Sequence, residues 1–188
     1  MKKIIATRKN TSTEAKKILD KAELLFDKNY VEKAVCSMAR SITVELSNSD
    51  PIVLPIMNGG LILGGMLIPQ LDFPLQIDYI HATRYRGGTS GNKLCWLKKP
   101  EKILQGRILL LIDDILDEGI TLSEVVKYCY DVGAKKVLTA VLAEKKMHNE
   151  KPFQCADFTA LQVPDRYVFG YGMDYREYHR NLMGIYAI

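Results

Sequence analysis

The sequence predicts an α/β fold with an open, twisted, mostly parallel sheet, helices on both faces and a small hood. Strand-like and helix-like segments alternate from residue 52 to residue 143. Residues 108–112 are continuously apolar, which is typical of a strand covered on both faces in a parallel sheet. Residues 158–188 are richer in aromatic side chains and short strand-like runs, so we expect them to form part of the hood.

The chain of 188 residues fits a single domain, 1–188, because a chain of this length buries most of its apolar surface in one core. We expect helices within residues 1–50 to pack on that core. The favoured interpretation of the formal net charge of +4 is a solvated basic face, and an anionic small ligand would benefit from the positive balance in any case. A nucleic-acid surface is the less favoured interpretation of the same charge.

Three further features indicate a cytoplasmic protein that does not enter a membrane. Residues 51–71 carry no charge, but prolines and the pairs Gly59-Gly60 and Gly64-Gly65 would break a membrane-spanning helix. The apolar start of the chain is interrupted by Arg8 and Lys9, unlike a signal peptide. The cysteines form no C-x-x-C unit, which favours reduced thiols.

The periodicity predicts each element in turn. Residues 12–48 read as two amphipathic helices, and the second has an apolar face made of Val31, Val35, Met38, Ile42 and Leu46. A strand at 52–56, a glycine loop with a helix to about 68, and a strand at 75–80 follow. A polar loop at 85–92 precedes strand 108–112, helix 121–131 and strand 136–143.

The segment that follows strand 108–112 has the character of a binding site. Parallel sheets bind ligands at the carboxyl ends of their strands, where Asp113 and Asp114 are expected. Backbone N–H groups of the turn 117–121, at a helix start, would hold a phosphate. The two carboxylates then need hydroxyl groups or Mg²⁺ opposite them, so the ligand implied is a ribose phosphate. A simple acidic helix start, capped by Asp117 or Thr121, would explain single residues but not the whole pattern.

Residues 108–123 resemble the phosphoribosyl pyrophosphate (PRPP) binding motif of the class I phosphoribosyltransferases: four apolar residues, two acids, two apolar residues, then Asp-x-Gly-x-Thr. Residues 163–182 resemble the purine-binding end of the hypoxanthine-guanine phosphoribosyltransferases within that family. The resemblance runs from about Pro51 to the C-terminus. It implies a glycosyltransferase that moves the 5-phosphoribosyl group from PRPP to N9 of hypoxanthine or guanine, giving IMP or GMP and pyrophosphate, with Mg²⁺ as cofactor.

The resemblance also assigns roles to the residues that hold PRPP. Asp117 would be the catalytic general base for the purine N7 proton. The ribose phosphate would be held by Asp113, Asp114, Glu118, Gly119, Ile120 and Thr121, and the pyrophosphate by Asn58, Gly59 and Arg180. The family often has a cis peptide at the position of Asn58-Gly59. It often has a basic residue in place of Asn58, and Thr and Lys in place of Glu118 and Ile120, so contacts to pyrophosphate differ here.

Purine binding would fall to Lys145, Tyr167, Val168 and Asp174. The Lys145 ammonium would donate to the exocyclic oxygen of a 6-oxopurine, and Tyr167 would stack on its ring. Magnesium would be bound by Asp113, Asp114 and Asp174, and Tyr85 would belong to a lid loop. Taken singly, these residues could equally be a solvated lysine, core side chains, surface ion pairs and an ordinary exposed loop.

Two alternatives to this function stay open. A regulatory nucleotide- or RNA-binding protein on the same fold would use the basic N-terminal segment, and a xanthine-preferring transferase would use the same site. The favoured partners are small molecules, PRPP and a 6-oxopurine, with no nucleic acid and no membrane, in a homodimer or homotetramer.

His81, His148 and His179 form no metal-binding pattern, and we expect structural or surface roles for them.

Overall fold

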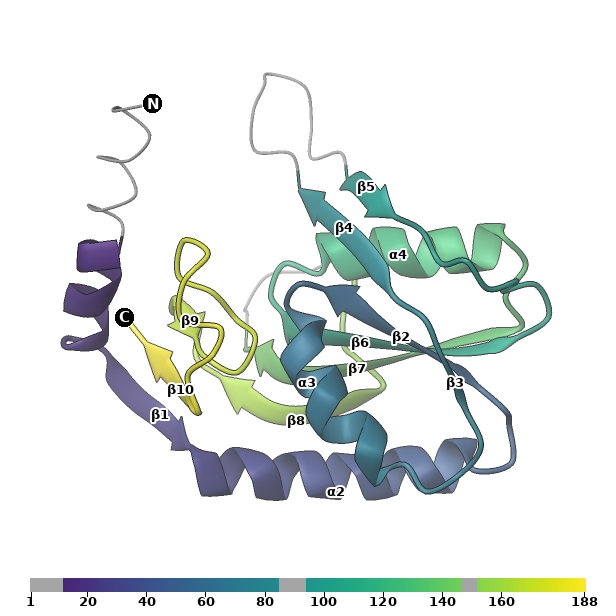
Figure 1. Cartoon of the computed structure of the whole chain (residues 1–188), viewed down its shortest axis with the longest axis horizontal. Coiled ribbons are helices and arrows are strands. Elements are labelled where there is room, and N and C mark those ends of the chain that lie inside the picture. Colours follow the sequence, from purple (N-terminus) through teal and green to yellow (C-terminus); the bar gives the residue numbers. More distant parts are fainter. Residues whose placement is uncertain (1–11, 85–93, 147–151) are drawn as a thin grey trace.

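The computed structural model describes residues 12–84, 94–146 and 152–188 (Figure 1). Its seven-stranded sheet has the order β5-β4-β2-β6-β7-β8, with β3 beside β2. The pairs β4-β2, β2-β6, β6-β7 and β7-β8 are parallel, and β5 is antiparallel to β4. The strands are β2 (Ile52–Met57), β3 (Gln76–Ile77), β4 (Ile80–Arg84), β5 (Leu94–Lys98), β6 (Ile108–Leu116), β7 (Lys136–Lys145) and β8 (Phe158–Val163).

Helices cover both faces of this sheet, which confirms the predicted fold class (Figure 1). Helices α2 (Lys28–Leu46) and α3 (Gly60–Leu67), followed by a 3₁₀ turn at Ile68–Gln70, enclose one apolar core against the sheet. Helix α4 (Ile120–Asp131) packs on the other face and completes a second core. No helix in the described part of the chain has the length and apolarity needed to cross a membrane, and residues 51–71 form strand, loop and helix.

The N-terminal region differs from the prediction of two helices. The second helix is confirmed as α2, which begins after Asp27, whose side chain accepts a hydrogen bond from Tyr30 N at 2.8 Å. Residues 12–19 are helical, but Glu23–Asp27 form strand β1. This strand pairs antiparallel with β10 (Gly184–Ala187), which also pairs with β9 (Val168–Phe169). Pairing with a segment about 160 residues away decides the conformation of β1, and local periodicity carries no trace of it.

Two strands also have different limits from those predicted. Strand β6 continues past residue 112 to Leu116, because β7 is long enough to pair with it as far as Glu144. The predicted strand 75–80 is divided into β3 and β4, and between them the Asp78 carboxylate accepts hydrogen bonds from Tyr79 N, Glu101 N and Lys102 N. Asp113 and Asp114 therefore lie within a strand rather than after it.

The three-stranded sheet β1-β10-β9 and the loops around it form the hood. Phe169 is fully buried at its centre, where its ring stacks on His179 and Tyr186 at centroid distances of 5.3 and 5.7 Å. Figure 1 shows the hood beyond the end of the central sheet at which β6 and β7 end. The carboxyl edge of the central sheet, where parallel strands present ligand-binding groups, therefore faces the hood.

Candidate active site

A cavity of about 660 Å³ lies between the carboxyl edge of the central sheet and the hood. Most of the predicted site residues line it, namely Asn58, Gly59, Asp113, Asp114, Asp117, Glu118, Gly119, Thr121, Lys145, Tyr167, Val168, Asp174 and Arg180. Ile120 is not among the lining residues; it is the half-buried first residue of helix α4. Tyr85 and His148 lie outside the described residues, so the predictions for the lid and for His148 stay predictions.

Asp113 and Asp114 form a carboxylate pair in the lining of the cavity. The Asp113 carboxylate accepts a hydrogen bond from Asp114 N at 2.9 Å. Burial, and then the charge of Asp114, raise the pKa of Asp113 well above its ordinary value. Burial also raises the pKa of Asp114, although the charge of Arg180 acts in the opposite direction. Two carboxylates in this position favour a bound cation or several hydroxyl donors, because either would offset their repulsion and desolvation.

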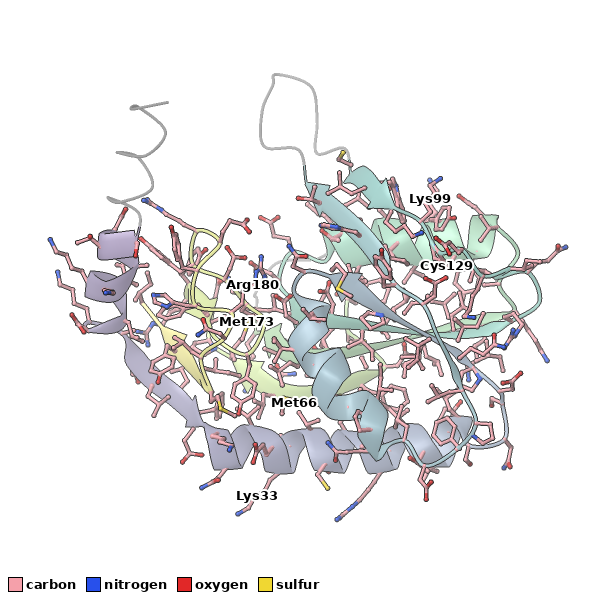
Figure 2. The ribbon with its side chains drawn as sticks, in the orientation of Figure 1. Lys33, Met66, Lys99, Cys129, Met173 and Arg180 are labelled. Carbon is pink, nitrogen blue, oxygen red and sulfur yellow. The ribbon has the colours of Figure 1, made fainter. Side chains whose placement is uncertain are left out.

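Arg180 joins this pair to the hood. Its Nη2 lies 2.7 Å from Asp174 Oδ1, and its Nη1 lies 3.6 Å from Asp114 Oδ2. The same Nη1 donates to Gly172 O at 2.5 Å. Figure 2 shows Arg180 and Met173 on the side of the hood that faces the central sheet. The guanidinium group thus lies between two carboxylates and presents positive charge to the cavity.

Asp117 and Lys145 meet because their strands are neighbours. Asp117 follows β6 directly, and Lys145 is the last residue of the adjacent parallel strand β7. Lys145 Nζ lies 3.1 Å from Asp117 Oδ2 and 3.7 Å from Asp165 Oδ1. The Lys145 side chain is 12% exposed and that of Asp117 is 40% exposed, so the pair is partly shielded from water. A carboxylate able to accept a proton and a donor to a ligand oxygen thereby share one wall.

The turn between β6 and α4 presents a helix N-terminus to the cavity. Gly119 precedes α4 with φ of 75°, a conformation that glycine adopts most readily. A Cβ atom at this position would lie 2.9 Å from Phe153 O, so the turn also needs glycine for space. The first N–H groups of a helix have no intrahelical acceptor and suit an anion such as phosphate.

Glycines bring the loop after β2, the carboxylate pair and the hood into contact. A Cβ at Gly59 would lie 2.2 Å from Asp114 Oδ2, and one at Gly172 would lie 2.4 Å from Gly59 O. These glycines therefore allow close approach of protein groups. The structure has a cis peptide at Met57-Asn58, one bond before the predicted position at Asn58-Gly59.

The hood contributes an aromatic side chain at the opposite wall. Tyr167 is 47% exposed, its hydroxyl donates to Asp174 O at 3.1 Å, and its ring meets Tyr175 edge-on at 5.6 Å. Val168 is buried beside it as the first residue of β9. A ring held in this way could stack on a planar ligand.

Several lining residues were not predicted, namely His81, Thr83, Met173, Arg176 and Glu177. His81, for which we expected a structural or surface role, lies on β4, which runs parallel to β2. The available signal was its place near the carboxyl end of a predicted parallel strand. Arg176 and Glu177 reach the cavity through the fold of the hood, which the motifs do not encode.

The carboxylates of Asp113 and Asp114 suit a divalent ion that is bound jointly by the protein and a ligand. They do not form a metal site whose ligands all come from the protein. Across residues 12–84, 94–146 and 152–188, no group of three or more His, Cys, Asp or Glu side chains is arranged to hold a metal ion. Arg180 lies between Asp114 and Asp174, two of the three predicted magnesium ligands. Mg²⁺ commonly takes one or two carboxylates and completes its shell with water and phosphate oxygens, which suits Asp113 and Asp114.

Comparison with known proteins identifies the class to which this site belongs. Residues 22–177 match the model of the phosphoribosyl transferase domain, so the chain belongs to that family. It is 31% identical over 170 residues to a hypoxanthine-guanine phosphoribosyltransferase of Aquifex aeolicus, with 89% of this chain and 95% of the relative covered. The Bacillus subtilis protein of the same name is 30% identical over 164 residues, covering 87% and 91%.

A solved structure agrees with this assignment. The chain matches a hypoxanthine phosphoribosyltransferase of Staphylococcus aureus with a TM-score of 0.80 and 25% identity, over 88% of this chain and 90% of the other. The family resemblance inferred from residues 108–123 and 163–182 is therefore confirmed. The family match over residues 22–177 includes the central sheet, the turn after β6 and the hood residues Tyr167, Val168 and Asp174.

Proposed function

We propose that this protein transfers the 5-phosphoribosyl group of PRPP to N9 of hypoxanthine or guanine, forming IMP or GMP and releasing pyrophosphate in purine salvage. The observation that carries the proposal is the pairing of Asp117 with Lys145 at 3.1 Å in the cavity that also holds the Asp113-Asp114 pair. The sheet side of the cavity offers groups suited to a ribose phosphate together with the Lys145 donor, and the hood side offers an aromatic ring, Tyr167, suited to a 6-oxopurine. The names of the relatives favour the same activity.

In the proposed reaction the bond from the ribose anomeric carbon to pyrophosphate breaks and a bond to purine N9 forms. Asp117 accepts the proton that leaves N7 as N9 attacks. The turn 118–121 holds the 5′-phosphate, and Asp113 and Asp114 hold the ribose hydroxyls. Arg180, with Asn58 and Gly59, lies at the pyrophosphate end. A Mg²⁺ ion held by Asp113, Asp114 or Asp174 would neutralise part of the pyrophosphate charge.

Lys145 is the residue that we propose for base selection. On ligand binding its ammonium would exchange the contact with Asp117 for the exocyclic oxygen of the purine, which frees Asp117 to accept the proton. Adenine offers an amino donor at that position and is therefore disfavoured. Tyr167 would stack on the ring, the Val168 backbone would read the base edge, and Tyr85 would belong to a lid that excludes water.

We also propose a cytoplasmic location, a homodimer or homotetramer, and small-molecule partners without nucleic acid or membrane. The cysteines, which form no C-x-x-C unit and are typical of reduced thiols, support the location. Size-exclusion chromatography with light scattering would measure the assembly, and a monomer at micromolar concentration would contradict this part of the proposal.

The activity is tested by incubating the purified protein with PRPP, Mg²⁺ and one of four bases, hypoxanthine, guanine, xanthine or adenine, and separating the nucleotides formed. We expect turnover with hypoxanthine and guanine, little with adenine, and none after chelation of the metal. Faster turnover with xanthine would favour the xanthine-preferring alternative. RNA affinity that falls with added salt, without turnover of any base, would favour the regulatory alternative.

A further inference from the structure

The hood loop 174–180 has a backbone that its own residues disfavour. Arg176, Glu177 and His179 have φ of 49°, 71° and 70°, in the left-handed region that side-chain-bearing residues seldom occupy. Arg176 and Glu177 are the central residues of a tight turn closed by hydrogen bonds between Tyr175 and Tyr178 in both directions, at 2.8 and 2.9 Å. Turns with two positive φ values normally use Asn and Gly. Groups outside the loop must therefore hold it.

The helical residues 12–19 supply these groups. Arg176 Nη1 donates to both carboxylate oxygens of Glu14, at 2.9 and 2.8 Å, and the Tyr175 hydroxyl lies 3.4 Å from Glu14 Oε1. His179 Nε2 lies 2.7 Å from Ala15 O, and Ala15 is buried. Figure 1 shows residues 12–19 as the purple helix beside the hood. Two of the three residues with positive φ are thus fixed from one helical turn.

The same loop carries charged groups into the cavity. Glu177 N donates to Asp174 Oδ2 at 2.8 Å, while Asp174 Oδ1 holds Arg180, which in turn approaches Asp114. Asp174, Arg176, Glu177 and Arg180 all line the cavity. A displacement of the turn would therefore move both the carboxylate and the guanidinium at the pyrophosphate end.

We propose that residues 12–19 position the active-site loop 174–180, with Glu14 as a positioning residue that acts through Arg176. The segment lies before residue 22, where the match to the family domain begins. The inference rests on the proposed phosphoribosyl transfer for its kinetic test. It rests on the contacts alone for its structural test.

The kinetic test compares Glu14→Gln with the unchanged protein under the assay conditions for hypoxanthine and PRPP. Because the ion pair is half-exposed, we expect KM for PRPP to rise about three- to fivefold, with kcat within about twofold. Glu45→Gln, which breaks the distant ion pair with Lys136, is the matched control and should leave both parameters unchanged. An unchanged or lower KM in Glu14→Gln, or a loss of kcat alone, would overturn the proposal.

A double-mutant comparison separates positioning from direct contact. If Glu14 acts through Arg176, then Glu14→Gln combined with Arg176→Gln is no worse than Arg176→Gln alone. Additive losses would overturn the proposal, because each residue would then act independently. Glu14→Asp keeps the carboxylate, so its KM for PRPP should lie between that of Glu14→Gln and that of the unchanged protein.

Hydrogen exchange tests the positioning without any turnover. In Glu14→Gln we expect faster amide exchange in residues 174–180, including Glu177 N–H, with unchanged exchange in β6 and β7. Exchange in 174–180 that matches the unchanged protein would overturn the proposal. A failed assay in the unchanged protein together with faster exchange in Glu14→Gln would refute the proposed function and retain the positioning role.

Discussion

The two walls of the cavity are built in different ways. The sheet wall comes mainly from one continuous segment, since Asp113 to Thr121 run from β6 into α4 and meet Lys145 at the end of the neighbouring strand. The hood wall combines Tyr167 and Val168 with the loop 174–180, beside a sheet that joins residues 23–27 to residues 184–187. The sheet wall follows from parallel strand pairing, whereas the hood wall depends on contacts between distant segments.

This difference predicts which residues affect the rate of the reaction and which affect ligand binding and stability. Asp117 and Lys145 on the sheet wall lie at the ends of two paired strands, so changes at these two residues should alter chemistry with little effect on stability. Groups on the hood wall are held by glycine contacts and by turns with positive φ, so changes there should alter stability and binding together.

The largest expected effect is that of Asp117→Asn on the sheet wall. Removing the proton acceptor should lower kcat about 10²- to 10⁴-fold, the usual contribution of a general base. Affinity for PRPP, measured by calorimetry, and the melting temperature should change little. Asp131→Asn, an exposed carboxylate at the end of α4, is the control. Full activity in Asp117→Asn would remove the general base from the mechanism.

Gly172→Ala should break the contact between the hood and the sheet wall. Its φ is 104°, and the added Cβ would lie 2.4 Å from Gly59 O, so we expect a loss of stability on the order of 3 kcal/mol. Thermal unfolding should show a melting temperature lower by about 5–10 °C, with reduced affinity for PRPP. Gly65→Ala is the matched control, because its Cβ meets nothing within 4 Å and should stabilise α3 by roughly 0.5–1 kcal/mol. Equal melting temperatures and equal PRPP affinities in the two variants would show that the close approach of Gly172 to Gly59 O is unimportant.

Lys145→Gln tests whether the sheet wall also selects the base. Loss of a charge-assisted hydrogen bond to the purine oxygen should lower kcat/KM for hypoxanthine about ten- to hundredfold. The ratio of hypoxanthine to adenine turnover should fall at the same time, as measured by separating the nucleotides. The exposed neighbour Lys146 provides the control Lys146→Gln. An unchanged ratio would place base selection elsewhere.

The smallest effect is the pH dependence of stability that comes from Asp113. Because burial and the charge of Asp114 raise its pKa in the folded protein, folding favours the protonated carboxyl group. This stability is present below the ordinary pKa of 3.8 and is lost as pH rises through the raised value. In EDTA, Asp113→Asn should therefore melt a few degrees above the unchanged protein at pH 7 and at nearly the same temperature near pH 3.

Added Mg²⁺ with pyrophosphate should reverse this order, because the charged carboxylate of the unchanged protein would gain a partner. Identical melting curves for Asp113→Asn and the unchanged protein at pH 7 in EDTA would contradict the raised pKa. The same measurement on Asp114→Asn should give a weaker effect, since Arg180 already opposes the shift of that carboxyl group.

The sequence by itself determined the parts that depend on local patterns. Apolar runs define β2, β6 and β7, helical spacing defines α2 and α4, and the order of acids, glycine and threonine after β6 predicts the anion-binding turn. Because parallel strands end at one edge, Asp117 after strand 108–112 and Lys145 after strand 136–143 could both be expected at the ligand-binding edge of the sheet.

Three features depend on the tertiary structure alone. Strand β6 continues through Asp113, and residues 23–27 form strand β1 instead of a helix. His81, Arg176 and Glu177 line the cavity. The pairing of β1 with β10 and the contact of Glu14 with Arg176 join residues more than 150 positions apart. Such contacts are selected by the folded chain as a whole, because their partners are distant in sequence and no local periodicity records them.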